Sequence, residues 1–289
     1  MKSRTVEKIV QSIKVEVAPN FRVRRPLPLN ELQMIDPFLL LDHFGPQPIQ
    51  PNDGDGVPEH PHRGFIAITY LLDGYIEHKD SVGNKVLVGP GDLDWMVTGS
   101  GIVHSELYDA DFKRRGGIVH GFQIWLNLPR AHKMTTPTLS PVTSENIPTV
   151  TTPEGVTVKI LAGEFQDKKS SVKTFTPVLF YHAHIPAGKQ IEIPVPAKFN
   201  TFAYGMAGSG LVGDTGRPLS LGELALFNND GESVLLSAPQ DKSADIILLG
   251  GEPLNEPVVT HGPFVMNTEG ELRQTFLDYQ SGKFGSITV

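Results

Sequence analysis

Short segments rich in β-branched and aromatic residues recur along this chain, and turn-forming residues separate them. Such segments include residues 65–72 (FIAITYLL), 85–88, 118–128, 155–161, 178–185, 199–204, 232–236 and 245–249. Asp-Gly, Gly-Asn, Pro-Gly and Ala-Gly pairs punctuate them, and the chain holds 29 glycines and 24 prolines. Strand-sized segments at this spacing are typical of an all-β sandwich or barrel. The sequence therefore predicts an all-β fold.

One stretch near the C-terminus predicts a helix. Thr268 and Glu271 have the spacing of a capping box, and Gly282 offers a stop signal. Between them Leu272, Phe276 and Tyr279 recur at helical spacing. We expect this short helix to pack as an amphipathic lid or clamp.

Length and linker composition predict two domains. A chain of 289 residues exceeds the usual size of one domain, and residues 128–155 form a polar, proline-bearing passage with little periodicity. We place the boundary so that residues 1–139 and 140–289 form the two domains. A weak internal echo, Tyr70 with Tyr204 and Gly91-Asp92-Leu93 with Gly222-Glu223-Leu224, suggests two copies of one β fold.

Composition excludes several classes of protein. No apolar run approaches the ~18 to 20 residues of a membrane span, and the N-terminus lacks the apolar core of a secretion signal. The absence of cysteine excludes disulfides and thiolate metal sites, which leaves histidine and carboxylate as strong metal ligands. A net charge of −7 disfavours direct nucleic-acid binding. We expect a cytoplasmic protein.

Two short motifs predict a metal site. In a strand, residues i and i+2 project to the same face, so His60 pairs with His62 and His104 pairs with Glu106. The residues between the two pairs read as strands, and a compact β-barrel can bring the pairs together across its interior. Three imidazoles and one carboxylate would then converge on one ion. Each motif alone is more often a satisfied polar segment, but the two together favour a metal.

Several motifs resemble the pirin family of the cupin superfamily. They are DPFLLLDHF (36–44), HPHRGF (60–65), PGDLDWM (90–96), GIVHSE (101–106) and HGPFVMNT (261–268). They occur in order from about residue 22 to residue 280, so the resemblance covers nearly the whole chain. It implies two facing cupin jelly-roll barrels, a bicupin, with a short C-terminal helix.

The resemblance also implies a single metal, bound only by the N-terminal domain. The family ligands fall on His60, His62, His104 and Glu106. We expect one divalent transition metal, Fe(II) first, with Ni, Co, Mn, Cu or adventitious Zn as alternatives. In the C-terminal domain the equivalent positions hold residues that do not bind metals, Pro194, Pro196, Leu235 and Ser237, and His182 and His184 are interpreted as histidines on a strand face.

Pirin-like proteins include quercetin 2,3-dioxygenases, so the resemblance implies an oxidoreductase that cleaves a flavonol or related phenolic substrate with O2 and releases carbon monoxide. We expect Glu106 to accept the proton of the flavonol 3-hydroxyl and so to give a metal-bound flavonolate. The alternative is a redox- or metal-sensing module of the transcriptional coregulator type, which binds a protein partner and has no significant turnover. The basic residues Arg22, Arg24 and Arg25 and the run 113–115 are its candidate surface. We expect a monomer.

Overall fold

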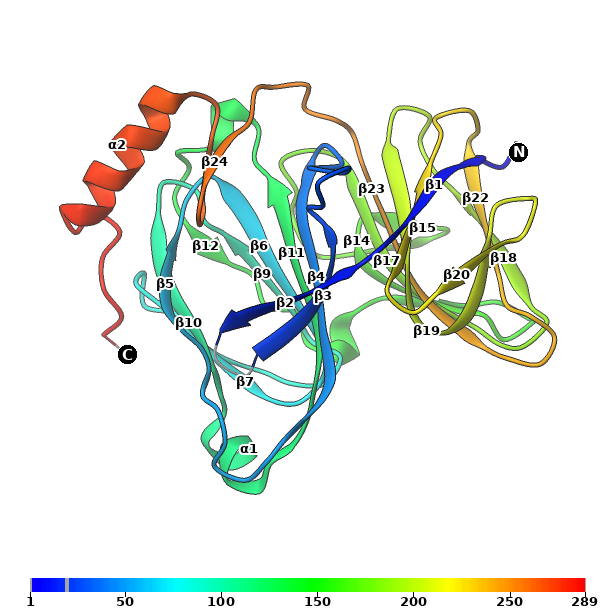
Figure 1. The fold of residues 1–289 in the computed structure, drawn as a ribbon, viewed down its shortest axis with the longest axis horizontal. Coiled ribbons are helices and arrows are strands. Elements are labelled where there is room, and N and C mark those ends of the chain that lie inside the picture. Colours follow the sequence, from blue (N-terminus) through cyan, green and yellow to red (C-terminus); the bar gives the residue numbers. More distant parts are fainter. Residues whose placement is uncertain (1, 19–20, 289) are drawn as a thin grey trace. The chain divides into compact units, whose positions relative to one another are not determined.

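A computed structural model describes residues 2–18 and 21–288 and divides the chain into two compact units. Unit 1 comprises Met1–Ile13, Arg25–Asp36 and Glu145–Pro253. Unit 2 comprises Lys14–Arg24, Pro37–Ser144 and Leu254–Val289. The described residues are mostly β, which confirms the predicted all-β class (Figure 1).

Unit 2 is built on two sheets. The seven-stranded sheet has the order β12 (Thr138–Leu139), β9 (Leu93–Val97), β6 (Phe65–Asp73), β11 (Gly117–Asn127), β4 (Phe38–Ile49), β3 (Phe21–Leu27) and β2 (Ile13–Ala18). The four-stranded sheet has the order β5 (Gly56–His62), β10 (Ile102–Tyr108), β7 (Ile76–Asp80) and β8 (Lys85–Val88). A β24–β25 hairpin (Val259–His261, Phe264–Met266), the helices α1 (Ala110–Arg115) and α2 (Glu269–Gln280) and the 3-10 turn η1 (Arg130–His132) complete this unit.

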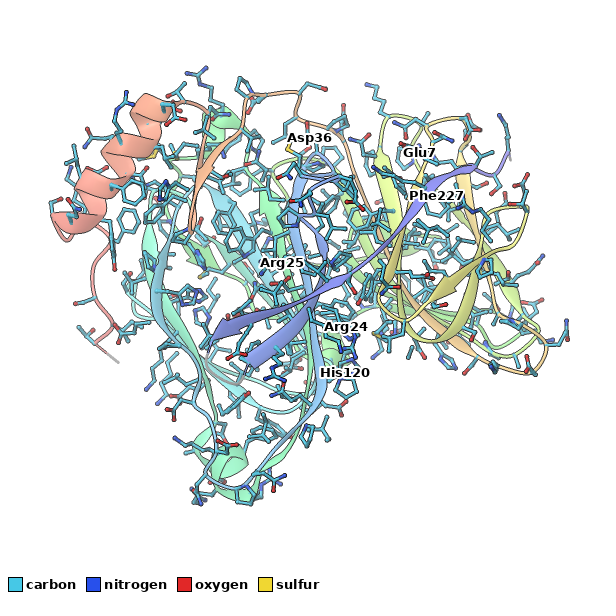
Figure 2. All side chains as sticks on the ribbon, in the orientation of Figure 1. Glu7, Arg24, Arg25, Asp36, His120 and Phe227 are labelled. Atoms are coloured by element: carbon cyan, nitrogen blue, oxygen red, sulfur yellow. The ribbon has the colours of Figure 1, made fainter. Side chains whose placement is uncertain are left out.

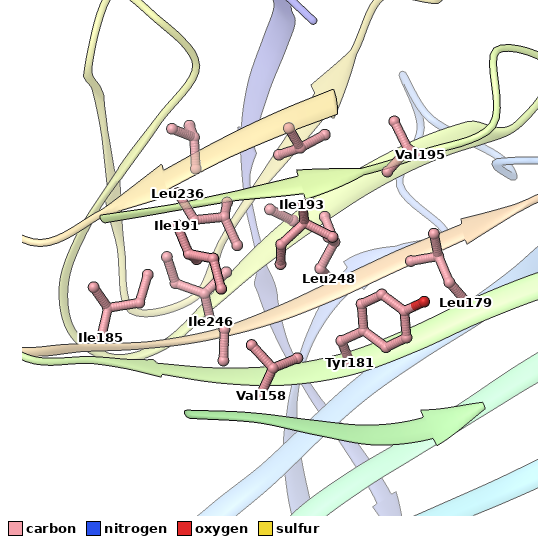
Figure 3. Packing of buried hydrophobic residues seen from close by; sticks show 14 of the residues in the cluster. Val158, Leu179, Tyr181, Ile185, Ile191, Ile193, Val195, Leu236, Ile246 and Leu248 are labelled. Atoms are coloured by element: carbon pink, nitrogen blue, oxygen red, sulfur yellow. The ribbon is translucent and has the colours of Figure 1, made fainter. Parts of the chain in front are cut away.

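Unit 1 carries a ten-stranded sheet. Its main path is β1 (Val6–Gln11), β21 (Glu223–Phe227), β19 (Asn200–Val212), β23 (Ala244–Gly251), β17 (Val178–Ile185), β14 (Thr157–Ala162) and β13 (Thr149–Thr151). Strands β18 (Gln190–Pro194), β22 (Ser233–Ser237) and β20 (Arg217–Ser220) join it off this path. A small β15–β16 ribbon (Glu164–Phe165, Lys168–Lys169) and the 3-10 turn η2 (Ser144–Asn146) precede β17. Alternate apolar residues of these strands form one core, as Figure 3 shows for Ile191, Ile193, Ile246 and Leu248.

The two units repeat one scheme of strand pairing. In unit 2, β11 pairs with β4 and β6, β6 with β9, and β5 with β10. In unit 1, β23 pairs with β17 and β19, β19 with β21, and β18 with β22. Tyr70 faces Leu93 in unit 2, and Tyr204 faces Leu224 in unit 1. The residues that repeat in the two halves of the sequence therefore occupy equivalent paired positions in the two jelly-roll units.

These units differ in four segments from the continuous division expected at residues 139 and 140. Met1–Ile13 and Arg25–Asp36 belong to unit 1, with most of the C-terminal half. The passage before residue 145 stays with unit 2, where β12 pairs with β9 and Val142 bridges Leu93. Residues 254–289, including α2, also belong to unit 2. The helix therefore joins the unit that carries the histidine motifs, because its buried side chains contact that unit.

Helix α2 begins and ends as predicted, but its buried face differs from the predicted one. Thr268 is the N-cap and accepts a hydrogen bond from the Glu271 N–H at 3.2 Å. The buried residues are Leu272, Thr275 and Asp278, whereas Tyr279 is 41% exposed. The apolar residues predicted to face the unit therefore form only part of the buried face of α2. The rest is polar, because Thr275 and Asp278 accept hydrogen bonds from a buried arginine. The sequence did not predict α1, which Asp109 caps by accepting from the Asp111 and Phe112 N–H groups.

Arg63 anchors α2 to the rest of unit 2. Its guanidinium donates to Asp278 Oδ2 at 2.9 Å and to Thr275 Oγ1 at 3.1 Å, and the ion pair is almost fully buried. It also donates to the Ser100 carbonyl at 2.8 Å and lies 4.6 Å from the centre of the Phe284 ring. The Arg63 side chain therefore connects the segment after β5 to helix α2 and to Phe284, which follows the helix.

Lys133 provides a second buried tie to the same segment. Its Nζ donates to the carbonyls of Gly64 and Val265 and to Asn127 Oδ1, at 2.8, 3.1 and 2.7 Å. Burial lowers the pKa of Lys133 to about 8, while Glu256 and Glu271 oppose the shift. The desolvated ammonium thus connects the residue before β6, the end of β11 and β25.

Neither α1 nor α2 combines the length and the apolar character that crossing a lipid bilayer by a helix would need, and the same holds for the remainder of the described chain.

Arg63→Met should lower the free energy of unfolding by about 3–5 kcal/mol, because Asp278 Oδ2 and Thr275 Oγ1 lose their buried donor. The Asp278 carboxylate then keeps donors only on Oδ1, from Lys283 and Gln274. Arg114→Met is the matched control, since it breaks an ion pair with Asp111 in which both side chains are about two-thirds exposed. Its cost should stay below about 1 kcal/mol. Denaturant unfolding followed by near-UV circular dichroism measures both, and equal costs would contradict the anchoring role.

Lys133→Met should lower the free energy of unfolding by about 3 kcal/mol or more, because three buried acceptors lose their donor. The folded-state pKa of about 8 lies below the ordinary 10.5, so the unfolded state binds more protons between these values. Wild-type stability should therefore rise relative to Lys133→Met as the pH increases from about 8 to 10.5. Urea midpoints of both proteins across this range test the sign, and a constant difference would refute it.

Candidate metal centre

The two histidine motifs lie on neighbouring strands of the four-stranded sheet. In the antiparallel pair of β5 and β10, His60 faces His104 directly and His62 faces Ile102. The sequence led us to expect the two pairs to meet across the interior of a barrel. They meet instead within one sheet, because the chain places β5 and β10 side by side.

Three imidazoles gather at this strand pair. One ligand atom from each of His60, His62 and His104 lies within 4.8 Å of the other two, and this is the single such group of three or more candidate ligands in the described part of the chain. The ring centroids of His60 and His104 are 4.3 Å apart, and His62 lies 4.6 and 5.0 Å from them. The cluster has the spacing that a single metal ion requires.

The hydrogen bonds of these rings leave nitrogens free for a metal. His60 Nδ1 donates to the Pro58 carbonyl at 2.8 Å and His62 Nδ1 contacts the Pro263 carbonyl at 3.4 Å. A carbonyl only accepts, so these bonds place the proton on Nδ1 and the lone pair on Nε2. Both nitrogens of His104 are buried and have no hydrogen-bond partner among the described residues. A buried ring with no partner is costly, and a metal ion would remove this cost.

Electrostatics keeps the buried rings neutral. Burial, with a contribution from His60, lowers the pKa of His62 well below its usual value. Burial and the neighbouring His60, His62 and His78 do the same for His104. Only neutral imidazole binds a metal, so both rings are in the binding form at neutral pH.

Glu106 lies next to the histidine group but outside it. A register shift between His104 and Glu106 places the carboxylate opposite Val57 on β5 and His78 on β7. Thr69 Oγ1 donates to Glu106 Oε1 at 2.6 Å, and Thr69 belongs to β6 of the facing sheet. The site therefore lies between the two sheets of unit 2. Burial raises the pKa of Glu106, against the opposing effects of Thr69 and His78.

His78 is a site neighbour that the sequence analysis missed. Its ring centroid lies 5.3 Å from that of His104, and its nitrogens lie 3.0 Å from Asp94 Oδ2 and 3.4 Å from Asp80 Oδ2. Burial opposes its protonation, but the contacts with Asp80 and Asp94 outweigh burial and raise the pKa of His78 to about 10. The sequence did contain a signal for this residue. His78 and Asp80 stand two residues apart on a short strand, as His60 and His62 do, and could have been predicted to face the same side.

Two glycines let the chain pass close to the histidine strands. Gly64 has φ +90°, and a Cβ there would lie 1.9 Å from the Val265 carbonyl oxygen. Gly101 has φ +123°, and a Cβ there would lie 2.5 Å from the Phe284 ring. Both positions therefore require glycine, and both are contacts with the C-terminal segment of the chain.

The facing sheet supplies an apolar wall. The rings of Phe65 and Trp125 lie 5.0 and 5.3 Å from that of His62, and 4.3 Å from one another. Trp125 and Gln123 are half-buried and stand two residues apart on β11, so they face the same side. Gln123 Nε2 donates to the Ile68 carbonyl, and its Oε1 lies 3.2 Å from Thr69 Oγ1. An aromatic surface and an ordered amide thus border the histidine group.

A second histidine pair lies outside this group. His43 on β4 and His120 on β11 have their Nε2 atoms 2.8 Å apart, and His43 stacks on Phe122 at 4.6 Å. Burial, with His120 and Arg24, lowers the pKa of His43 to about 3. Figure 2 labels Arg24 and His120 in this part of unit 2. The neutral His43 ring is therefore fixed by its contact with His120 and by stacking on Phe122.

The remaining candidates have local partners. Lys113 and Arg114 of the basic run form ion pairs with Asp55 and Asp111 on and beside α1. Arg24 donates to the Gly45 carbonyl at 2.6 Å. On β17, His182 and His184 share Asp245 Oδ1, at 3.3 and 3.0 Å.

Family models match both halves of the chain. The pirin model covers residues 20–126, and the model of the pirin C-terminal cupin domain covers residues 180–285. Human pirin is 38% identical over 268 residues, which is 91% of this chain and 88% of that protein.

Solved structures agree with these matches. A crystal structure of quercetin 2,3-dioxygenase from Acinetobacter baumannii superposes with a TM-score of 0.92 at 32% identity, over 99% of this chain and 100% of that one. A pirin from Escherichia coli in complex with nickel(II) shares the fold, with a TM-score of 0.66 at 19% identity over 85% of this chain and all of that one. The jelly-roll units are therefore two cupin domains, and the chain belongs to the pirin family of the cupin superfamily.

Proposed function

We propose that this protein is a metal-dependent dioxygenase that cleaves flavonols such as quercetin with O2 and releases carbon monoxide. The observation that carries the proposal is the group of three histidines, in which His104 is buried with both nitrogens unpartnered among the described residues. The solved quercetin 2,3-dioxygenase, similar over the full chain, supports the reaction class.

The proposed ligands are His60, His62 and His104, with Glu106 as the fourth. A divalent transition metal, Fe(II) by our expectation and nickel(II) as in the solved E. coli relative, would supply Lewis-acid polarisation and redox capacity at this place. The imidazole and carboxylate donors suit such metals and, without thiolate, do not resemble closed structural zinc sites.

The chain's own residues would bind and deprotonate the flavonol. The half-buried Trp125 offers flat apolar surface to the aromatic rings, and the fully buried Phe65 packs against Trp125 and His62 and excludes water from that side of the site. Glu106 accepts the proton of the 3-hydroxyl, and its raised pKa brings the base closer to the working pH. Thr69 orients that carboxylate through its 2.6 Å hydrogen bond.

We continue to expect that the protein is cytoplasmic and monomeric.

A redox-sensing, protein-binding role is the second candidate, because human pirin is 38% identical over most of the chain. In that case the histidine group would bind metal without turnover, and a surface of the protein would contact a protein partner. The two candidates differ in whether a flavonol is consumed.

His104→Ala should remove the metal. Protein purified without added metal should hold about one ion per chain, and the variant should hold almost none, because a central donor is lost. His184→Ala, outside the group, should keep full occupancy. Elemental analysis of folded protein, verified by circular dichroism, gives the ratio. Full occupancy in His104→Ala would refute the proposed centre, and His104→Gln provides a second variant.

Glu106→Gln should lower the rate of O2-dependent quercetin consumption about 100-fold or more, because the amide cannot accept the proton. Glu77→Gln, on the exposed side of β7, should retain the wild-type rate. Anaerobic quercetin should also shift its absorption band to that of the deprotonated flavonol in wild type only. If metal-loaded wild type shows neither the shift nor bleaching in O2, the dioxygenase proposal fails and the sensing role remains.

A further inference from the structure

Unit 1 contains a cavity of about 590 Å³ at one end of its core. The turn after β14, the segment from Lys169 to Thr174, the start of β17 and the chain after β18 surround it. Figure 3 shows Leu179, Tyr181 and Val195 at one end of the core cluster, and all three line the cavity. The volume falls in the range of small-molecule pockets.

The cavity occupies the place in unit 1 that the histidines occupy in unit 2. Strand β18 pairs with β22 in unit 1 as β5 pairs with β10 in unit 2. When the two halves of the sequence are aligned on Tyr70 and Tyr204, Pro194 and Pro196 fall at the positions of His60 and His62. Pro194 faces Ser233 across the strand pair, where His60 faces His104. In this register the counterpart of His104 is Ser233 and not, as the sequence offset had indicated, Leu235, because Leu235 pairs with Glu192. Both prolines line the cavity. Unit 1 thus keeps a hollow at the equivalent position, with proline rings in place of imidazoles.

The lining carries no net charge. Its two charged residues, Glu164 and Lys169, form an ion pair at 3.4 Å, and both are well exposed at the rim. An ionic ligand would lose hydration on entering and would compete with this pair for a counter-charge. The lining therefore favours a neutral molecule.

The shape of the walls favours a flat ring system. Proline rings and the rings of Tyr181 and Phe199 present flat apolar faces, against which aromatic molecules pack well. The Tyr181 hydroxyl donates to the Glu164 carbonyl, and the Ser170 hydroxyl donates to the Leu161 carbonyl at 2.7 Å. These bonds fix the wall and commit both hydroxyls to the protein. Thr174 adds a third hydroxyl to the lining.

Gly163 allows the rim to close against the start of β17. It has φ +85°, and a Cβ there would lie 2.6 Å from the Val178 carbonyl oxygen. The turn that carries Glu164 can therefore approach Val178 only with glycine at this position. The rim is thus held by backbone contact and not by the ion pair alone.

We propose that this cavity of unit 1 is a second binding site, independent of metal, for a neutral flat aromatic molecule whose hydrogen-bonding group lies near Thr174. It does not depend on the proposed dioxygenase activity, since none of its lining residues belongs to the histidine group. The strand pairing that brings three imidazoles together in one unit borders, in the other, a mostly apolar pocket whose lining has no net charge.

The test uses the full chain without metal and two matched probes, 2-methoxynaphthalene and 2-naphthoate. Neither probe has the adjacent oxygen donors of a flavonol, so neither reports on the proposed reaction. Titration followed by amide NMR should shift the signals of Gly163, Ser170 and Val178 with the neutral probe. The anion should bind at least about tenfold more weakly, because the pocket offers it no free counter-charge.

Val172→Trp should fill the cavity and weaken binding of 2-methoxynaphthalene at least about tenfold, since Val172 is a half-buried lining residue. Lys173→Trp is the matched control, because the neighbouring side chain is exposed and does not line the cavity. Val172→Phe, a smaller change, should have an intermediate effect if the tryptophan variant does not fold. Shifts confined to residues of unit 2, equal binding of both probes, or unchanged affinity in the filled variants would overturn the proposal.

Discussion

The pairing of β5 with β10 is the constraint on which the site depends. The register sets His60 opposite His104, and the side-chain alternation of β5 brings His62 to the same face. A slip of one residue would turn these rings to the other face of the sheet. Glycines before and after the strands, and the buried cations Arg63 and Lys133, fix the chain on either side of this register. Backbone pairing and not loop geometry therefore determines where the imidazoles meet.

The two units show how one pairing scheme supports different chemistry. Equivalent strands and equivalent tyrosine registers recur in both, yet one strand pair sets His60 opposite His104 and the other sets Pro194 opposite Ser233. The first arrangement leaves unpaired nitrogens in a buried place, and the second leaves an apolar hollow. Because equivalent strands pair in both units, the difference in chemistry follows from the side chains that these strands carry.

Much of the fold could be predicted from the sequence, because strand signals are local. Residues 85–88 and 178–185 were predicted with the bounds that β8 and β17 have, and Thr268 caps α2 as its spacing indicated. The short α1 was missed, since a single turn of helix has almost no periodicity. The exchange of terminal segments between the units was missed as well, because the long-range contacts that hold it, such as Arg63 with Asp278, leave no local pattern.

The site was predictable to a similar degree. Same-face pairing identified the three histidines, but it placed them across a barrel interior, because strand order is not readable from one sequence. The role of Glu106 as a fourth ligand stays a prediction, and its partner Thr69 comes from the other sheet. His78 was missed because its significance comes from Asp94, which lies on a strand of the facing sheet.

The clasp of the histidine strands by residues 263–284 has a consequence for biosynthesis. Arg63 can contact Asp278, Lys133 the Val265 carbonyl, and Gly101 the Phe284 ring only when residues 263–284 have emerged from the ribosome. The largest segment of unit 2, Pro37–Ser144, precedes the largest segment of unit 1, yet unit 2 is completed only by residues 254–289, after all of unit 1 has been translated. In a nascent chain the histidine strands therefore lack these contacts until residues 263–284 have been synthesised.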